Sequence, residues 1–333
     1  MDKISPCFFG VTEQPDVWQA SYEITNLCNL KCKHCCNDSS LSANKGLGKE
    51  EIFDLVDDLK EINVTSIYLT GGEPTVVPYF KEVVEYINLR GISLVMATNG
   101  FNISSNIQSI KKNISHQAGV FVSLDGIGET HDEFRGIEGA FDKTINSIKL
   151  LVNNNIPTRI STVVWKKNIL QLEKMIKLAK SLGVYQINFS MLFNTGRTAK
   201  NNIEIGNSQY KQIVKKIHSL IKKYSDDKFI VSTKRDHIIG NKSDHCRGGE
   251  KILHINSKGE IFPCSWSEKC SLGSGCRAQW KKGNIKECVA KIKEFQNLVR
   301  ERIDLLGYSG CPAMAVDYYK DKYADDPLNE LLK

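Results

Sequence analysis

No uninterrupted apolar run in this sequence is long enough to cross a membrane, and its opening lacks the basic-then-apolar order of a signal peptide. Nor is there a basic patch interleaved with aromatic residues, the pattern typical of nucleic-acid-binding proteins. These absences favour a cytoplasmic protein with no membrane and no nucleic-acid partner. With 41% hydrophobic and 25% charged residues, the 333-residue composition is ordinary for a soluble globular protein. The net charge of +7 permits an acidic substrate without indicating one.

The 11 cysteines are unevenly distributed, and about 210 cysteine-free residues separate two groups. In a reducing compartment, clustered cysteines indicate metal binding or catalysis rather than disulfides, so two distinct sites are predicted. We interpret Cys7 as a free thiol and Cys288, inside a helical pattern, as a core residue. The N-terminal group is Cys28, Cys32, Cys35 and Cys36, and the other members of the C-terminal group are Cys246, Cys264, Cys270, Cys276 and Cys311.

Short strand-like segments alternate with amphipathic helical patterns through the first part of the chain. Repeated strand–helix units joined by short loops imply a parallel sheet with helices outside it. Six such units predict an α/β fold, an open, partial (β/α)6 TIM-like barrel, with reactive residues on loops after the strands. The predicted strands are Tyr22–Thr25, Ser66–Thr70, Ser93–Thr98, Val120–Leu124, Arg159–Val164 and Gln186–Met191.

The pattern changes after about residue 207, where a basic helix leads into a cysteine- and glycine-rich stretch. A hairpin of Ile252–Ile255 and Ile261–Phe262 is predicted there, within a small α+β domain. We therefore expect four parts: an N-terminal extension (1–17), the barrel core (18–206), a connecting helix and strand (207–240) and the small C-terminal domain (241–333).

Three cysteines directly follow the first predicted strand with the spacing C-x3-C-x2-C, namely Cys28, Cys32 and Cys35. Three thiolates on one tight loop can hold three irons of a [4Fe–4S] cluster and leave the fourth iron open. The alternative is a zinc site, although zinc sites usually have paired C-x2-C motifs.

This motif and four others, in order on loops after predicted strands, resemble the radical S-adenosylmethionine (SAM) superfamily. The resemblance implies that SAM binds the open iron, is cleaved by electron transfer to a 5′-deoxyadenosyl radical, and that this radical abstracts hydrogen from a substrate. It also implies a reducing partner such as flavodoxin or ferredoxin. The implied SAM contacts are Gly71, Gly72, Glu73 and Pro74 for the ammonium, Asn99 for the ribose, Ser123 and Arg135 for the carboxylate, and His34 beside the adenine.

The C-terminal cysteines resemble the SPASM and twitch extensions of radical SAM enzymes, which bind auxiliary iron–sulfur clusters. The resemblance implies one auxiliary [4Fe–4S] cluster with Cys246, Cys264 and Cys311 as ligands, and a structural zinc site is the alternative. The fourth ligand is Cys270 or Cys276, or it is absent. Leu328 stands where a full SPASM domain has a cysteine, so we expect no second auxiliary cluster.

Three hypotheses for the reaction remain open. The first is a maturase of ribosomally made peptides (RiPPs), acting by epimerisation, thioether formation or carbon–carbon crosslinking, because the extension and the segment Asn194–Arg197 look like those of peptide maturases. An epimerase needs a hydrogen donor, for which Cys270, Cys276 and Cys36 are candidates. The second hypothesis is a radical dehydrogenase or isomerase of a small molecule such as an aminosugar. The third is a non-enzymatic iron–sulfur or zinc protein that retains the fold.

Overall fold

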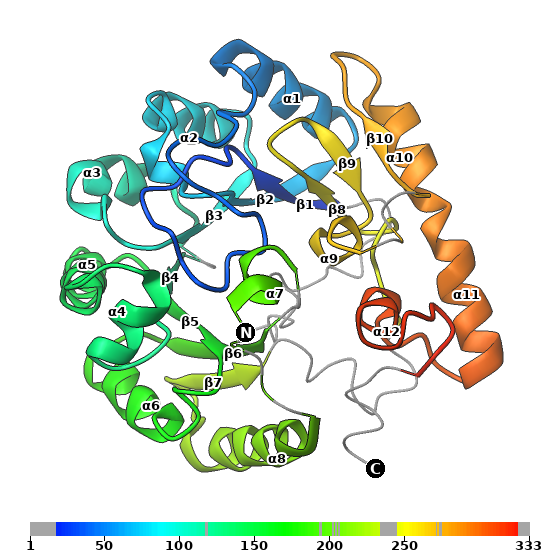
Figure 1. Cartoon of the computed structure of the whole chain (residues 1–333). Coiled ribbons are helices and arrows are strands. Elements are labelled where there is room, and N and C mark those ends of the chain that lie inside the picture. Colours follow the sequence, from blue (N-terminus) through cyan, green and yellow to red (C-terminus); the bar gives the residue numbers. More distant parts are fainter. Residues whose placement is uncertain are drawn as a thin grey trace.

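In the computed structural model, the chain folds into a curved sheet with helices along its outer side (Figure 1). The structure describes residues 18–325, except 117–118, 193–194, 202, 204, 206, 234–244, 271 and 273–274. Cys7, Asn194 and Leu328, to which the sequence analysis gave an interpretation, lie outside the described residues. No helix in the described part is long and apolar enough to span a membrane.

The sheet contains ten strands in the order β10-β9-β8-β1-β2-β3-β4-β5-β6-β7. All neighbouring pairs from β8 to β7 in that order are parallel, and β9 and β10 continue the sheet in antiparallel pairing. The strands are β1 (Trp18–Glu23), β2 (Val64–Thr70), β3 (Ser93–Thr98), β4 (Val120–Ser123), β5 (Thr158–Val164), β6 (Gln186–Met191), β7 (Ile230–Thr233), β8 (Ile252–Ile255), β9 (Glu260–Phe262) and β10 (Ala278–Gln279).

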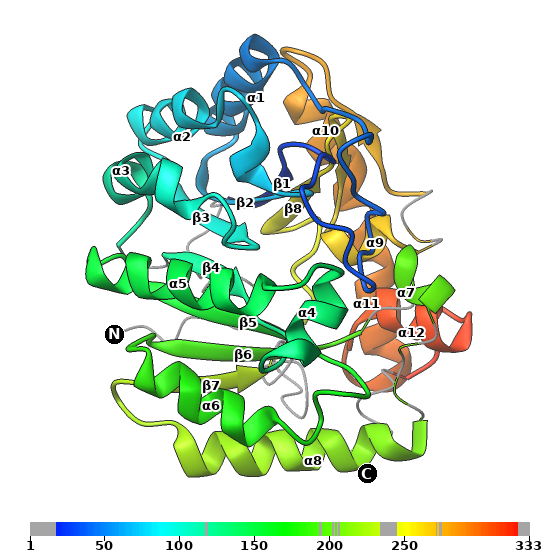
Figure 2. The same ribbon diagram turned by 60° about the vertical axis from the view of Figure 1, so that its left-hand side comes forward.

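Most of the helices lie outside this sheet, as the two views in Figures 1 and 2 agree. Those between the first strands pack their apolar faces on the outer side of the sheet. The helices are α1 (Lys49–Glu61), η1 (Pro74–Val76), α2 (Phe80–Leu89), α3 (Ile103–Asn113), α4 (Glu129–Arg135), α5 (Ala140–Asn153), α6 (Leu172–Ser181), α7 (Arg197–Asn201), α8 (Asn207–Tyr224), α9 (Ser265–Glu268), α10 (Ile285–Lys293), α11 (Phe295–Leu306) and α12 (Pro312–Tyr319).

The predicted partial barrel is confirmed, and the structure adds a strand at each edge of the six. β7 pairs with β6, and β8 pairs with β1, with Ser21 opposite His254. The predicted hairpin is present as β8 and β9, but β8 also belongs to the barrel sheet. The C-terminal cysteines are therefore attached to the barrel by continuous backbone pairing. The domain boundaries at residues 206 and 240 stay predictions.

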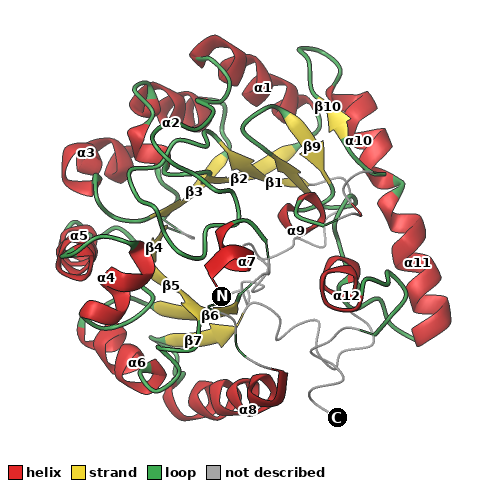
Figure 3. Ribbon diagram, viewed as in Figure 1, coloured by secondary structure: helices red, strands yellow, loops and turns green. Residues whose placement is uncertain are grey.

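Alternation along β1 separates an apolar outer face from a polar inner face. Ala20 and Tyr22 belong to the main core shared with the outer helices. Ser21 and Glu23 point to the opposite face, because successive side chains of a strand alternate. Glu23 thus lies on the inner side of the sheet at the carboxyl end of β1, where loops and short helices gather inside the ring of outer helices (Figure 3).

Candidate cofactor site and second cysteine cluster

The loop after β1 brings the three N-terminal cysteines together. Cys28 and Cys32 are buried, Cys35 is half-buried, and the three pack with Leu30 and Phe101. The separation of two to three residues places all three thiols on one turn-rich loop at the carboxyl edge of the sheet.

Each of these sulfurs accepts a hydrogen bond from an N–H group. The donors are the backbone N–H of Leu30 to Cys28 (3.5 Å), the backbone N–H of Ser39 to Cys35 (3.3 Å) and Nη1 of Arg135 to Cys32 (3.7 Å). Burial raises the pKa of the Cys28 thiol to about 12, and burial also raises that of Cys32. Buried thiols with N–H donors become thiolates when a metal binds them, so the donor set fits an iron–sulfur cluster.

The segment Gly71–Pro74 packs its backbone directly against the residues before Cys28. The backbone N–H groups of Gly72 and Glu73 donate to the carbonyls of Thr25 (2.7 Å) and Leu27 (2.9 Å). A Cβ at Gly72 would lie 2.1 Å from the Leu27 carbonyl oxygen, so only glycine permits this approach. In the described structure these glycines thus fix the position of the cysteine loop.

The Glu73 carboxylate is buried and joins this segment to the end of β3. It accepts hydrogen bonds from Thr98 Oγ1 (2.8 Å) and from the backbone N–H of Asn99 (2.7 Å). The Asn99 side chain in turn donates to Asn29 Oδ1 (2.8 Å) and lies 4.0 Å from the Cys28 sulfur. The structure thus brings Glu73 and Asn99 to the cysteine loop. Ser123 is half-buried at the end of β4.

Arg135 is held beside Cys32 by a buried ion pair with Asp125. The other carboxylate oxygen of Asp125 accepts from the backbone N–H of Val163 (2.7 Å). Within the described residues, Nε of Arg135 is buried and has no hydrogen-bond partner. A buried cation with an unused donor next to the cysteines fits an anionic group such as the carboxylate of SAM.

Replacing Asp125 with Ala leaves the buried guanidinium of Arg135 uncompensated. Removing one partner of a buried ion pair costs about 3–5 kcal/mol, so we expect the free energy of unfolding to fall by about that amount. Denaturant unfolding followed by circular dichroism measures it. The matched control is Glu85→Ala, which removes an exposed pair with Lys112 and costs below about 1 kcal/mol. Equal losses in the two variants would contradict the structural role of the buried pair.

His34 packs into an aromatic stack. Its ring lies 4.2 Å from that of Phe134 at an interplanar angle of 4°, and Phe134 in turn stacks on Trp165. Burial, with Arg135 and Arg197 nearby, holds the pKa of His34 well below its usual value. A neutral, stacked imidazole is suited to an aromatic neighbour rather than to charge.

Several of the C-terminal cysteines lie near one another, whereas Cys276 has a different environment. Cys264, Cys270 and Cys311 lie close enough to interact electrostatically, and burial raises the pKa of Cys264 to about 11 and of Cys270 to about 12. The Cys246 sulfur lies beside Gly248, which in turn packs against the carbonyl of Pro263, the residue before Cys264. Cys264, Cys270 and Cys311 therefore lie near one another around α9 and the start of α12, and the backbone beside Cys246 packs against the residue before Cys264.

Cys276 lies apart from the other C-terminal cysteines in space. The charged groups that act on its thiol are Glu294, Lys291 and Lys322, and no cysteine is among them. Cys288 is buried in the core, on α10, where the sequence analysis expected it.

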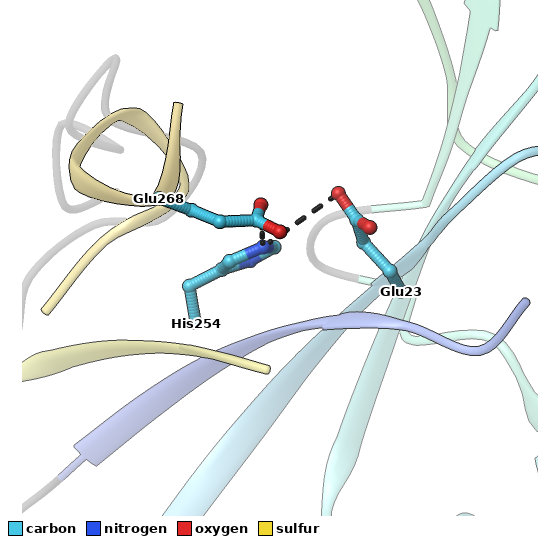
Figure 4. Close-up of side chains that lie close together, drawn as sticks. All are labelled: Glu23, His254 and Glu268. Atoms are coloured by element: carbon cyan, nitrogen blue, oxygen red, sulfur yellow. Dashed lines mark hydrogen bonds and ion pairs between the residues drawn. The ribbon is translucent and has the colours of Figure 1, made fainter. Parts of the chain in front are cut away.

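A polar cluster joins β1 to the C-terminal region on the inner side of the sheet (Figure 4). His254 Nε2 lies 3.1 Å from a carboxylate oxygen of Glu268 and 3.6 Å from one of Glu23. The ammonium of Lys269 lies 2.5 Å from Glu268 and 3.7 Å from Glu23, so the two carboxylates share a cation. These residues form an ion-paired network in the described structure, and three of them have the donor types of a metal site.

Cys36 lies beside this network. The residue as a whole is exposed, whereas burial of its thiol raises the pKa to about 12, and Lys269, Glu23 and Glu268 all act on the thiol. No motif in the sequence gives a role to Glu23, His254 or Asp125. Glu23 and His254 come from distant parts of the chain, so no local spacing could have indicated that they meet.

Known proteins similar to this chain include radical SAM enzymes. The model of the family described as the radical SAM superfamily matches residues 22–179. The chain is 29% identical over 267 residues to the AdoMet-dependent heme synthase of Methanosarcina barkeri, which covers 74% of this chain and 76% of that protein. It is 28% identical over 269 residues to AlbA of Bacillus subtilis, an antilisterial bacteriocin subtilosin biosynthesis protein, which covers 80% of this chain and 59% of that protein.

Among solved structures, SuiB of Streptococcus suis bound to S-adenosylmethionine has the same fold. Its TM-score is 0.71 at 15% identity, and the match covers 95% of this chain and 77% of SuiB. SuiB has also been solved with its precursor peptide SuiA. Residues 22–179 therefore form a radical SAM domain, and the comparisons support an enzyme whose cofactors are a [4Fe–4S] cluster and S-adenosylmethionine.

Proposed function

We propose that Cys28, Cys32 and Cys35 ligate the SAM-binding [4Fe–4S] cluster. The observation that carries this assignment is the meeting of three sulfurs on one loop, each with an N–H donor, beside the unused Nε donor of Arg135. When bound, the cluster and SAM supply a 5′-deoxyadenosyl radical that abstracts hydrogen from the substrate.

The chain's own residues position and shield this chemistry. Arg135 binds the SAM carboxylate together with Ser123, and Asp125 holds the guanidinium in place. Asn99 lies at the ribose, and His34 lies beside the adenine. The residues Gly71, Gly72, Glu73 and Pro74 hold the cysteine loop against the end of β3 and complete the ammonium site.

The second site holds one auxiliary [4Fe–4S] cluster in this proposal. Its ligands are Cys246, Cys264, Cys311 and, as the fourth, Cys270 rather than Cys276, because only Cys270 lies with the other sulfurs. In the proposed organisation, residues 18–206 form the barrel core and residues 241–333 form the cluster domain. A flavodoxin or ferredoxin is the proposed reductant.

The proposed substrate is a ribosomally made peptide, which is epimerised or crosslinked through a thioether or a carbon–carbon bond. Support comes from the similarity to AlbA, a bacteriocin biosynthesis protein, and from the fold shared with SuiB. For epimerisation Cys36 is the favoured hydrogen donor. Cys270 belongs to the cluster ligands and Cys276 lies apart, whereas Cys36 has exposed surface.

Synthetic peptides encoded by short reading frames beside the gene test this proposal. Each is incubated with reconstituted enzyme, SAM and dithionite in deuterated water, and the products are analysed by mass spectrometry. We expect one peptide to lose two hydrogen atoms on crosslinking, or to gain one deuterium on epimerisation. Cys36→Ala removes the deuterium gain in the second case, and Cys276→Ala, the matched control, keeps it.

Turnover of a small molecule with no peptide modified would overturn the peptide assignment. That outcome has specific support of its own, because the similar protein from Methanosarcina barkeri is a heme synthase. A radical dehydrogenase or isomerase of a small molecule is therefore the second candidate function.

A further inference from the structure

The segment after β6 forms hydrogen bonds along most of the cysteine loop. Nε of Arg197 donates to the carbonyl of Cys32 (2.7 Å), and its Nη1 donates to the carbonyl of Ser39 (2.9 Å). The backbone N–H of Arg197 donates to the carbonyl of Cys35 (2.9 Å). Three carbonyls of the loop that carries the proposed cluster ligands thus take their donors from one residue about 160 positions downstream.

Neighbouring residues of α7 continue the same contact. Thr198 Oγ1 donates to the carbonyl of His34 (3.0 Å), and Asn201 Nδ2 donates to the carbonyl of Lys33 (2.9 Å). Gly196 lies so close that a Cβ there would be 2.5 Å from the Cys35 carbonyl oxygen. Every carbonyl from residue 32 to residue 35 therefore has a donor in residues 196–201, which we name the clamp segment.

We propose that the clamp segment is a positioning element for the SAM-binding cluster, and that Arg197 is its central residue. Two guanidinium nitrogens donate to the carbonyls of Cys32 and Ser39, and this bridge closes the stretch of loop that contains Cys35. Arg197 is largely buried, with its side chain 16% exposed, so these bonds are shielded from water. Arg135 acts on the sulfur of Cys32, whereas Arg197 fixes the backbone of the same residue.

This bridge of two hydrogen bonds depends on the shape of the guanidinium and not on its charge alone. A planar fork offers several N–H groups in fixed directions, whereas a lysine ammonium is a single point charge on a flexible stem. Arg197→Lys therefore keeps the charge near Asp38 but cannot bridge both carbonyls. The loss of this bridge lets the loop open and releases iron from the SAM-binding cluster.

The test uses the full chain, reconstituted without oxygen. The electron paramagnetic resonance (EPR) signal that changes when SAM is added reports the SAM-binding cluster, and its decay is followed after addition of an iron chelator. We expect this signal to decay about tenfold faster in both Arg197→Ala and Arg197→Lys, because a buried hydrogen bond is worth about 1.4 kcal/mol or more. The remaining iron–sulfur signal should decay at the wild-type rate.

Lys200→Ala is the matched control, since Lys200 is an exposed residue of α7 that forms an ion pair with Asp38. It should behave as wild type. Thr198→Val, which removes a single donor while keeping the side-chain volume, should give a smaller acceleration of about threefold and serves if Arg197→Ala does not fold. No acceleration, a wild-type rate in Arg197→Lys, or equal acceleration of all iron–sulfur signals would each overturn the proposal.

This inference rests on the proposed ligand role of Cys28, Cys32 and Cys35, and the two fail differently. A SAM-responsive signal that survives substitution of all three cysteines would overturn the ligand assignment. A signal that requires the three cysteines but is indifferent to Arg197 would overturn only the clamp.

Discussion

Substitution of Cys28, Cys32 and Cys35 by Ala together is expected to lower the iron content from about eight to about four per chain and to abolish formation of 5′-deoxyadenosine. The first expectation follows from the two proposed clusters, because the N-terminal cysteines pack with Leu30 and Phe101 while Cys264 lies with Cys311. The second follows because one cluster is the entry point of the electron that cleaves SAM. Iron and sulfide analysis, EPR and chromatography of the reaction products measure the two effects.

The control is Cys288→Ala, a buried core cysteine in α10 without a proposed ligand role. It should keep about eight irons and full cleavage of SAM. About four irons in the wild type and none in the triple variant would instead show that the C-terminal cysteines hold no iron–sulfur cluster. They would then be zinc ligands or redox thiols.

The barrel was predictable because its signals are local. Each strand from β2 to β6 is a short apolar or β-branched segment next to an amphipathic helix, and such repeated units allow few arrangements. The strand added at each edge was not predictable in the same way. The residues of β8 read as half of a hairpin, and nothing in them indicates that their other edge pairs with β1.

Of the candidate site, the sequence supplied the residues that sit in motifs and missed those that act through long-range contacts. Gly72 illustrates the first case, although its structural contact is with the Leu27 carbonyl. Arg197 illustrates the second. In the sequence, the segment around it shows only a likeness to peptide maturases, and the donation of Arg197 to Cys32 and Ser39 depends on how the loop after β6 folds back over the loop after β1.

The polar cluster of Glu23, His254, Glu268 and Lys269 is the clearest case of what a pattern cannot reveal. Its members come from β1, β8 and the region of α9, and they meet only because β8 joins the barrel sheet. Asn37, two residues after Cys35, donates to Glu23 (2.7 Å), while Lys269 directly precedes Cys270. The network therefore lies between the two cysteine groups, and it places Cys36 at their junction.

The same geometry makes the fourth auxiliary ligand a sharp prediction. In the background that lacks Cys28, Cys32 and Cys35, the proposed auxiliary cluster is expected to remain, with about four irons. Adding Cys270→Ala should remove most of this iron and the corresponding EPR signal, whereas adding Cys276→Ala should leave both unchanged. The reason is position, since the Cys270 thiol lies with those of Cys264 and Cys311, and Cys276 lies with Lys291 and Glu294.

Sequence alone left these two cysteines equivalent, because they lie six residues apart in the same glycine-rich stretch. The short helix α9 places Cys270 with Cys264. Cys264 caps α9 and accepts a hydrogen bond from the backbone N–H of Ser267 (3.3 Å), and Cys270 follows the end of α9, with its thiol donating to the carbonyl of Ser267 (3.7 Å). One turn of helix thus presents both sulfurs to the same side. Loss of the cluster in Cys276→Ala with retention in Cys270→Ala would contradict this arrangement, and retention in both would mean that three cysteines suffice and that one auxiliary iron is open to substrate.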